Sequence, residues 1–379
     1  MKSRVDCFIF ADALGWKLAQ ERNFLDDLLP VRSPAQTLFG YSSTCDPTIL
    51  TGALPCDHGH FSFFVKADND SPFKGLGRFG FLPQKIAGHH RIRNRVSRYY
   101  AKALGYTGYF QLYSVPFGRL PYLDYTEKKD IYEPGGIIGG QPTIFEFWEE
   151  SKKPWLRSDW RAGDAANLAQ AKQALEKGDI ELLYLFTAGL DATMHRYGPS
   201  GPEVDAAFDQ FASELRQLHA IASKHYREVR LHLFSDHGMA KITTASNMLK
   251  RWPEIDLRYG EDYVAVWDST MVRFWFNNDR ARDITAGWLR AQPDGKIVTD
   301  KELAAGGCLF PERQYGDLFY LLPAGSLFVP SYMNLGFVKG MHGYDPAHED
   351  STACWLATHE TLPVKSLTDI YPVMRAAAQ

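Results

Sequence analysis

The chain has 379 residues, of which 45% are hydrophobic and 14% aromatic, with 31 glycines and 21 prolines. This composition is typical of a folded, enzyme-sized globular protein and excludes a largely disordered chain. The 42 basic and 45 acidic residues leave a net charge of −3, so the charge balance gives no reason to expect a nucleic-acid polymer as a partner.

The cysteines and apolar runs bear on the cellular compartment. The five cysteines have no CxxC spacing, which indicates reduced thiols rather than a disulfide framework. The apolar run CFIFA near the N-terminus is too short for a signal-peptide core and ends at Asp12. No later run approaches the roughly 18 apolar residues of a membrane span. The sequence therefore predicts a soluble, cytoplasmic protein and leaves its oligomeric state open.

Three apolar runs in chain order each end in a carboxylate. VDCFIF at residues 5–10 precedes Asp12, ELLYLFTAG precedes Asp191, and VRLHLFS precedes Asp236. Runs of this length and polarity are typical of strands buried on both faces. If the strands are parallel, their carboxyl ends meet at one edge of the sheet, where sites in such folds gather.

A helix is predicted between the last two runs. Apolar residues recur there at steps of three and four, at positions 204, 208, 211, 215, 218 and 221. Strand, helix and strand in this order indicate a parallel sheet with right-handed crossovers. Near the C-terminus, STACWLATH is expected to return as a core strand and SLTDIYPVMRAAA to form a terminal helix.

Two regions interrupt this α/β pattern. Residues 61–160, rich in aromatics, glycine and arginine, are expected to form loops and helices beside the sheet edge. Residues 243–330 hold strand-like stretches, DYVAVW, TMVRFWF and GDLFYLLP, and are expected to form a small α+β cap. The catalytic core would then comprise residues 1–242 and 331–379.

Asp and His recur at spacings that suit metal ligands. Asp191 and His195 lie four residues apart and would share one helix face. Asp236 and His237 are adjacent at a strand end, and His342 lies in GMHG, where glycine permits an unusual backbone. Taken singly, each histidine is more often structural and each strand-end Asp more often a helix cap. Together with Asp12 they form a nitrogen and oxygen ligand set suited to Zn²⁺, with Mn²⁺ or Fe as alternatives.

Five motifs in order resemble a known superfamily. FADALGW, YSSTCDPTILTGALPCDHGH, LDATMHRYGP, FSDHGMA and KGMHGYDP are similar to the motifs of the alkaline phosphatase superfamily, most of all its type I phosphodiesterase/nucleotide pyrophosphatase family. The similarity covers about residues 5–52, 181–240 and 337–374. It implies a three-layer α/β/α core with a mainly parallel sheet and an inserted cap.

The resemblance implies two divalent metal ions, most readily Zn²⁺. Asp12, Asp236 and His237 match the ligands of the ion that activates the nucleophile. The second ion would be held by Asp191, His195 and His342. Such a pair of ions stabilises the attacking and leaving oxygens of a displacement at phosphorus, and the expected course runs through a covalent phosphoenzyme that water then hydrolyses.

The resemblance also selects the nucleophile in YSSTCDPTILTG. In this superfamily the attacking residue stands ten positions before the Gly of the TG pair that closes the following helix. That Gly is Gly52 here, which selects Ser42, with a helix expected to start near residues 46–47. Ser43 and Thr44 would then cap the helix or contact phosphate. A sulfatase would need Pro at position 44 and Arg at position 46, so Thr44 and Asp46 exclude that family.

One position departs from the family pattern. Many members carry an Asn shortly after an HGI segment, where it contacts a phosphoryl oxygen, but DHGHFSFF places Phe63 there. His60 and Ser62 are the nearest polar replacements. His58, by contrast, is expected to be structural.

The predicted function is therefore hydrolysis of a phosphodiester or pyrophosphate bond in a small anionic phosphate ester. A phosphomonoesterase, phosphonate hydrolase or phosphotransferase on the same scaffold is the alternative, and a catalytically silent binding protein is a third reading. The basic run at residues 85–102 is interpreted as a solvated helix face, and most of the aromatic stretch 109–125 as packing.

Overall fold

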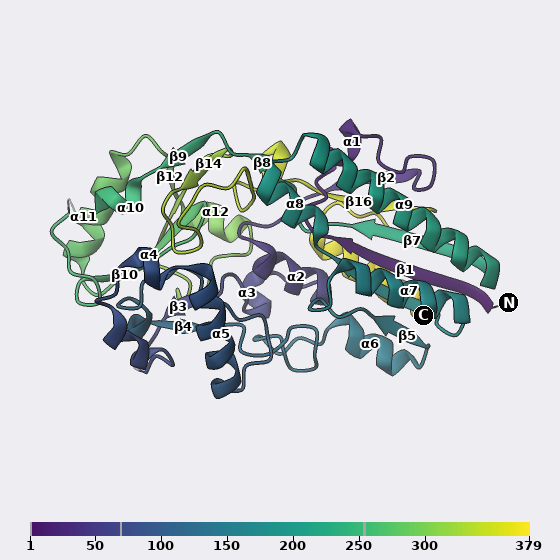
Figure 1. The fold of residues 1–379 in the computed structure, drawn as a ribbon, viewed down its shortest axis with the longest axis horizontal. Helices are drawn as coiled ribbons and strands as arrows, with labels where there is room; N and C mark the ends of the chain where they lie inside the picture. The colour runs from purple at the N-terminus through teal and green to yellow at the C-terminus, as the bar shows by residue number, and fades with distance from the viewer. Residues whose placement is uncertain (1, 69, 253–254) are drawn as a thin grey trace.

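The fold is described from a computed structural model, which covers residues 2–68, 70–252 and 255–379. Figure 1 shows an elongated molecule with helices on both sides of a central sheet at one end and a second, smaller sheet at the other. The N- and C-termini lie at the end of the central sheet, away from the smaller one.

The central sheet has six strands in the order β2-β16-β7-β1-β6-β5. Strand β1 pairs in parallel with both β6 and β7, β5 pairs in parallel with β6, and β16 runs antiparallel between β7 and β2. The bounds are β1 Lys2–Ala11, β2 Val31–Ala35, β5 Trp155–Arg157, β6 Leu182–Thr187, β7 Tyr226–Phe234 and β16 Ala353–Ala357.

Alternate residues of β1 point to two different apolar layers. Val5, Cys7 and Ile9 pack in one buried cluster with residues of α1, α7, α8 and α9, whereas Phe8 and Phe10 pack in another with residues of α2, α6 and α13. Because the second half of β1 is buried on both faces, residues 7–11 form a continuous apolar run. The bounds of these helices are α1 Trp16–Glu21, α2 Ser42–Thr51, α6 Ile144–Ser151, α7 Asp164–Lys177, α8 Gly189–Tyr197, α9 Pro202–His225 and α13 Ile370–Ala377.

The structure confirms the predicted α/β class and its three layers. The helix predicted from apolar spacing is α9, and five of its six predicted core residues are buried, with the sixth, Ile221, half-buried at its end. The predicted returning strand is β16 and the predicted terminal helix is α13. Among the described residues, no helix is both long and apolar enough to cross a membrane.

The smaller sheet lies between residues 263 and 321, inside the predicted cap. Its four strands have the order β10-β11-β13-β12 and are all antiparallel. The three predicted cap strands are β10, β11 and β13, and β12 was not predicted. The cap elements are α10 Met248–Arg251, β10 Tyr263–Trp267, β11 Met271–Phe276, α11 Asp279–Arg290, β12 Lys296–Val298, α12 Asp300–Ala305 and β13 Leu318–Leu321.

Two short sheets lie at the junction of cap and core: β8 pairs with β15 on the core side, and β9 pairs with β14 on the cap side. Their bounds are β8 Ala240–Lys241, β9 Thr244–Ser246, β14 Ser326–Phe328 and β15 Gly340–Met341. Strand β15 directly precedes His342, so this junction also sets the position of a predicted ligand.

The aromatic-rich first insertion packs against the cap in one apolar cluster. Phe64, Phe73 and Tyr125 share this cluster with Trp252 and Phe274. Helix α3 Pro55–His58 precedes the first insertion, whose elements include β3 Phe64–Lys66, α4 Gln84–Ala87, α5 His90–Leu104 and β4 Leu123–Tyr125. Further along, α6 and β5 also fall within residues 61–160 but pack on the central sheet. The division into core and cap stays a prediction.

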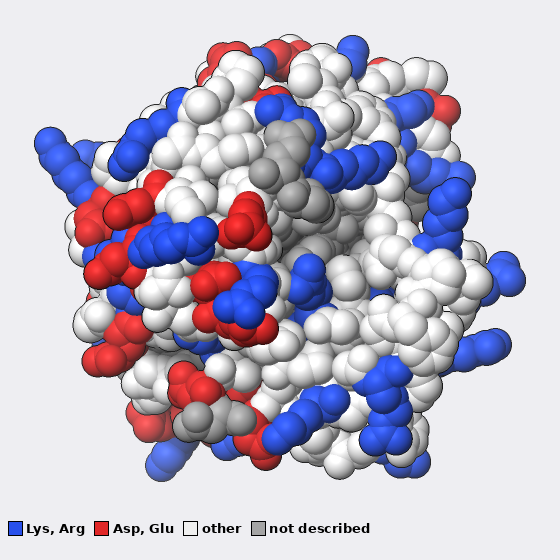
Figure 2. Space-filling view, turned by 90° about the vertical axis from the view of Figure 1, so that its left-hand side faces the viewer, with Lys and Arg blue, Asp and Glu red and all other residues white. Residues whose placement is uncertain are grey.

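The charged residues of this end are of both signs. Figure 2 looks onto the end where α11 and β10 lie, with Lys and Arg spread around the face and Asp and Glu gathered on one half of it.

Within α5, Arg93 is buried over the ring of Phe117, 4.0 Å from its centroid, whereas Arg91, Arg95 and Arg98 are exposed. Most of this basic run is thus a solvated helix face.

A buried arginine joins the cap to the first insertion. Arg273 on β11 is fully buried and forms an ion pair with Asp268, with Nε 2.9 Å from Oδ2. It also donates to the carbonyl of Phe64 at 2.9 Å and to the hydroxyl of Ser62 at 2.9 Å. A buried guanidinium is stable only when its donors are paired in this way.

We predict that Arg273→Met lowers the free energy of unfolding by about 3–5 kcal/mol, because it leaves the buried carboxylate of Asp268 without its cation. Chemical denaturation followed by tryptophan fluorescence measures this loss. Arg280→Met on the exposed face of α11 is the control, with an expected change near zero. Equal effects of the two substitutions would contradict this role for Arg273.

Candidate active site

Three carboxylates follow the three central parallel strands. Asp12 comes directly after β1, Asp191 follows β6 on α8, and Asp236 follows β7. Because β6, β1 and β7 are neighbours in the sheet, their carboxyl ends bring these side chains together. The hydrogen bond from the N–H of Asp12 to the carbonyl of Thr187, 2.9 Å long, joins the ends of β1 and β6.

The first group of potential ligands comprises Asp12, Asp236 and His237, whose ligand atoms all lie within 4.8 Å of one another. Nε2 of His237 is 3.0 Å from Oδ2 of Asp236 and 3.6 Å from Oδ1 of Asp12. Nδ1 of His237 lies 3.0 Å from the carbonyl of Gly238. A backbone carbonyl at Nδ1 orients the ring and leaves Nε2 to face a metal ion.

The second group comprises Asp191, His195 and His342, with ligand atoms again within 4.8 Å of one another. Oδ1 of Asp191 is 3.2 Å from Nε2 of His195, one helical turn away, and 3.7 Å from Nε2 of His342. Nδ1 of His195 lies 2.9 Å from the carbonyl of Gly340. The backbone after His342 has a φ of +84° at Gly343, which few side chains allow.

The two groups adjoin one another. The rings of His237 and His342 are stacked with centroids 3.7 Å apart. The structure thus brings together all six residues that the sequence predicted as metal ligands. Their assignment as ligands stays a prediction.

The chemistry of this cluster fits divalent cations. Oδ1 of Asp12, Oδ1 of Asp191 and Oδ2 of Asp236 are buried and have no hydrogen-bond donor among the described residues. Buried carboxylate oxygens are costly unless a cation or donors compensate them. Three carboxylates and three imidazoles are a donor set that suits divalent transition-metal ions.

The pKa values reflect this crowding of negative charge. Burial and then the neighbouring charge of Asp236 raise the pKa of Asp12 well above its usual value. Burial, followed by His237 and His195, lowers the pKa of His342 well below its usual value. A bound cation would favour the ionised Asp12 and the neutral His342 alike.

Ser42 lies at the first group. Its Oγ is 3.1 Å from Nε2 of His237. The prediction that α2 starts near residues 46–47 was wrong: the helix starts at Ser42 itself, after Tyr41 in an extended conformation, and ends at Gly52 with a φ of +70°. Ser42 therefore stands in the first turn. The N–H groups of Thr44 and Cys45 donate to the carbonyl of Tyr41, whereas those of Ser42 and Ser43 have no backbone acceptor among the described residues and can bind an anion.

The other hydroxyls of this turn donate to a backbone carbonyl. Ser43 and Thr44 both donate to the carbonyl of Phe61, at 3.0 and 2.6 Å, and Cys45 is buried, which raises its thiol pKa well above the usual value. As phosphate contacts, Ser43 and Thr44 stay predictions. Their hydrogen bonds fix the first turn of α2 on residue 61.

The position where the family carries Asn is apolar here. Phe63 packs against the rings of Tyr109 and Tyr125, with centroids 5.1 and 5.6 Å away. His60 is 2% exposed, its Nε2 accepts the N–H of Ile138 at 3.0 Å, and burial lowers its pKa to about 4. The hydroxyl of Ser62 accepts from Arg273. His60 as a substrate contact stays a prediction.

The sequence matches the model of the type I phosphodiesterase / nucleotide pyrophosphatase family over residues 35–345. The chain belongs to this family. Its members are hydrolases, and the chain is an enzyme of the phosphodiesterase/pyrophosphatase class.

Solved structures share the fold. Murine ectonucleotide pyrophosphatase/phosphodiesterase 5, as an inactive variant in complex with AMP, is 16% identical with a TM-score of 0.66, over 100% of this chain and 95% of that one. Human ectonucleotide pyrophosphatase/phosphodiesterase 5 is 14% identical with a TM-score of 0.67, over 99% of this chain and 95% of that one. This likeness shows that the fold is shared over the whole chain.

The sequence analysis missed residues that position the predicted metal ligands of this chain. Asp164, at the start of α7, accepts from the N–H groups of Ala188 and Gly189 at 2.9 and 2.8 Å. These are the first backbone donors of α8, which carries Asp191 and His195. A Cβ at position 189 would lie 2.5 Å from Oδ2 of Asp164, so a larger residue there would displace this carboxylate. Asp164 caps a helix that lies 24 residues further along the chain, and residue spacing gives no signal for such a distant cap.

Tyr41 was also missed, although it directly precedes Ser42, the predicted nucleophile. Its hydroxyl lies 2.8 Å from Oγ1 of Thr270, which donates to the carbonyl of Gly343 at 2.7 Å. These hydrogen bonds connect the nucleophile turn, the cap and the loop that carries His342. Asp46, one turn after Ser42, contributes a further carboxylate whose pKa burial and the charge of Asp236 raise.

We predict that Asp164→Ala weakens metal binding about 10–100-fold, because it removes the acceptor that orients α8 without touching a ligand. Competition with a chromophoric chelator measures the affinity. Asp209→Ala, exposed on α9, is the control and should bind metal as the wild type does. An unchanged affinity in Asp164→Ala would show that α8 needs no such support.

Proposed function

We propose that this protein hydrolyses a phosphodiester or pyrophosphate bond through a covalent intermediate on Ser42 at a two-metal site. The observation that supports this best is the position of Ser42, whose Oγ lies 3.1 Å from Nε2 of His237. Family membership supports the reaction class, and the adjoining ligand groups support the paired cofactor.

Two divalent ions would be held by the two ligand groups described above. Zn²⁺ suits the mixed nitrogen and oxygen ligands best, with Mn²⁺ or Fe as alternatives. When bound, such ions favour the alkoxide of a nearby hydroxyl and stabilise charge on phosphoryl oxygens.

The chain's own residues then divide the remaining work. Oγ of Ser42 attacks phosphorus and forms the P–O bond, while the bond to the leaving oxygen breaks and that oxygen is released as an alcohol or phosphate. The first-turn N–H groups of α2 bind the non-bridging oxygens. Water then cleaves the Ser42 ester, which restores the hydroxyl and releases a phosphate monoester.

The substrate is proposed to be a small, nucleotide-like phosphate ester. The structure of murine ectonucleotide pyrophosphatase/phosphodiesterase 5 contains AMP. The shared fold and the family of this chain support a related ligand here. Phe63 offers no hydrogen bond to a phosphoryl oxygen, so the preference between diester and monoester is set by other residues of this chain.

We also propose that the protein works in a reducing compartment such as the cytoplasm. All five cysteines are free, and Cys7, Cys45, Cys308 and Cys354 are buried. Free thiols are the norm where glutathione and thioredoxin keep cysteines reduced.

We predict that Ser42→Ala lowers kcat on a diester substrate by at least about 10³-fold. Among the described residues, no other side-chain hydroxyl forms a hydrogen bond with His237. Metal content and circular dichroism should stay those of the wild type. Ser43→Ala is the matched control and should keep most turnover, because its hydroxyl donates to Phe61. Substantial turnover by Ser42→Ala would instead assign the attack to Ser43 or Thr44.

The bond that is cleaved can be tested on the zinc- and manganese-loaded enzyme. We expect faster turnover of bis-p-nitrophenyl phosphate and of a nucleotide pyrophosphate than of p-nitrophenyl phosphate or a phosphonate monoester. Rates measured at equal concentration under kcat/KM conditions decide the preference. A faster monoester reaction would move the assignment to a phosphomonoesterase on this scaffold.

A further inference from the structure

A second cluster of metal-binding side chains lies in the central sheet outside the active site. Asp6 on β1, His232 on β7 and His359 just after β16 offer one ligand atom each, all within 4.8 Å of one another. Strands β1, β7 and β16 are neighbours. The cluster is therefore built from three adjacent strands, as the active site is.

This cluster lies toward the opposite edge of the sheet from the active site. Asp6 precedes Asp12 by six residues along β1, which corresponds to about 20 Å of strand. No residue of the cluster belongs to either active-site group. The two sites are separate in space and in their ligands.

Asp6 and His232 are deeply buried, 2% and 1% exposed. Oδ1 of Asp6 and Nε2 of His232 are hydrogen-bonded at 3.0 Å. Two ligand atoms of a tetrahedral zinc ion lie about 3.3 Å apart, so an ion could replace this hydrogen bond with little movement of the two side chains. Nδ1 of His232 is buried with no hydrogen-bond partner among the described residues. A purely structural polar pair would be expected to satisfy such an atom.

Neighbouring residues fix the ligands in place. The ring of His232 stacks on Phe8, with centroids 4.3 Å apart and planes 6° from parallel. Nε of Arg4 is 2.8 Å from Oδ2 of Asp6, which leaves Oδ1 directed at His232. Partners that orient a ligand from outside in this way are a regular feature of metal centres in proteins.

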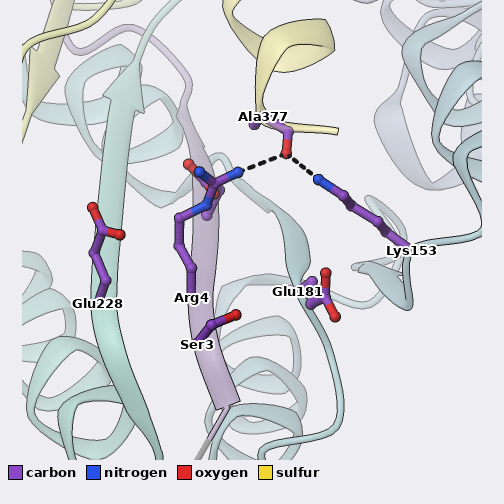
Figure 3. Close-up of a pocket in the computed structure, with 7 residues that line it drawn as sticks. Ser3, Arg4, Lys153, Glu181, Glu228 and Ala377 are labelled. Carbon is purple, nitrogen blue, oxygen red and sulfur yellow. Dashed lines mark hydrogen bonds and ion pairs between the residues drawn. The ribbon is translucent and has the colours of Figure 1, made fainter. Parts of the chain in front are cut away.

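A cavity reaches the cluster at Asp6, although neither His232 nor His359 lines it. Asp6 lines a cavity of about 270 Å³ together with Arg4, Lys153, Glu181 and Glu228. Figure 3 shows Arg4 and Lys153 both donating to the carbonyl of Ala377 at one side, with Glu228 and Glu181 on either side of β1. The half-buried His359 completes the cluster from the end of β16.

We propose that Asp6, His232 and His359 form a third metal site, which binds a divalent transition metal, Zn²⁺ foremost. Two imidazoles and one carboxylate suit this class of ion better than Ca²⁺ or Mg²⁺, which prefer all-oxygen ligands. The ion would link three strands at the edge of the sheet remote from catalysis, and its role would be to stabilise the fold.

The test is zinc stoichiometry of the full-length protein after removal of metal with a chelator. Isothermal titration with Zn²⁺ alone should give one equivalent more for the wild type than for His359→Gln, whatever the active site holds. Zn²⁺ should also raise the Tm of the wild type more than that of His359→Gln. Turnover of bis-p-nitrophenyl phosphate by the fully loaded His359→Gln should equal that of the wild type.

His219→Gln on α9 is the matched control: it removes a half-buried histidine outside all three clusters and should keep the wild-type stoichiometry. Asp6→Asn provides a second variant with the same expected loss of one equivalent, should His359→Gln fail to fold. Equal zinc stoichiometry in the wild type and the folded variant would overturn the proposal. Because the readout is a difference between variants, failure of the two-metal active site would not mimic this result.

Discussion

The structure depends on one electrostatic constraint at the carboxyl edge of the central sheet. Parallel pairing of β6, β1 and β7 forces Asp12, Asp191 and Asp236 into one buried space. The inner oxygens of these carboxylates have no hydrogen-bond donor among the described residues. Their ionised form therefore needs a compensating positive charge. Everything else around the site serves to hold this charge in place or to present a substrate to it.

Helix ends and loop junctions supply that support. Asp164 caps the helix of Asp191 and His195, and the N-terminus of α2 places Ser42 beside His237. Tyr41 and Thr270 connect that turn to the cap and to the His342 loop. The nucleophile, one ligand loop and the cap are thus one hydrogen-bonded unit, so a change in the cap can reach the site without a mutation in it.

The α/β core could be predicted because its signals are local. Continuous apolar runs ended by Asp mark β1, β6 and β7, and the apolar spacing of α9 is that of a helix packed on a sheet. The six clustered residues followed from motif order and strand ends. The start of α2 was missed because Pro47 suggested a first-turn position, whereas Pro47 lies inside the helix.

Long-range packing was out of reach of the sequence. That Phe64 and Phe274 share one apolar cluster, or that Arg273 pairs across to the first insertion, depends on contacts over 200 residues apart. Short strands such as β12 carry too few residues for a period. The Asp6 cluster stayed hidden for the same reason, since its three members lie on strands distant in sequence and follow no motif.

Anomalous diffraction at the zinc edge from crystals of the zinc-loaded enzyme tests the central claim most directly. The account predicts two peaks about 4 Å apart at the carboxyl edge of the sheet, one enclosed by Asp12, Asp236 and His237 beside Oγ of Ser42, the other by Asp191, His195 and His342. A single peak, or none between these side chains, would contradict it.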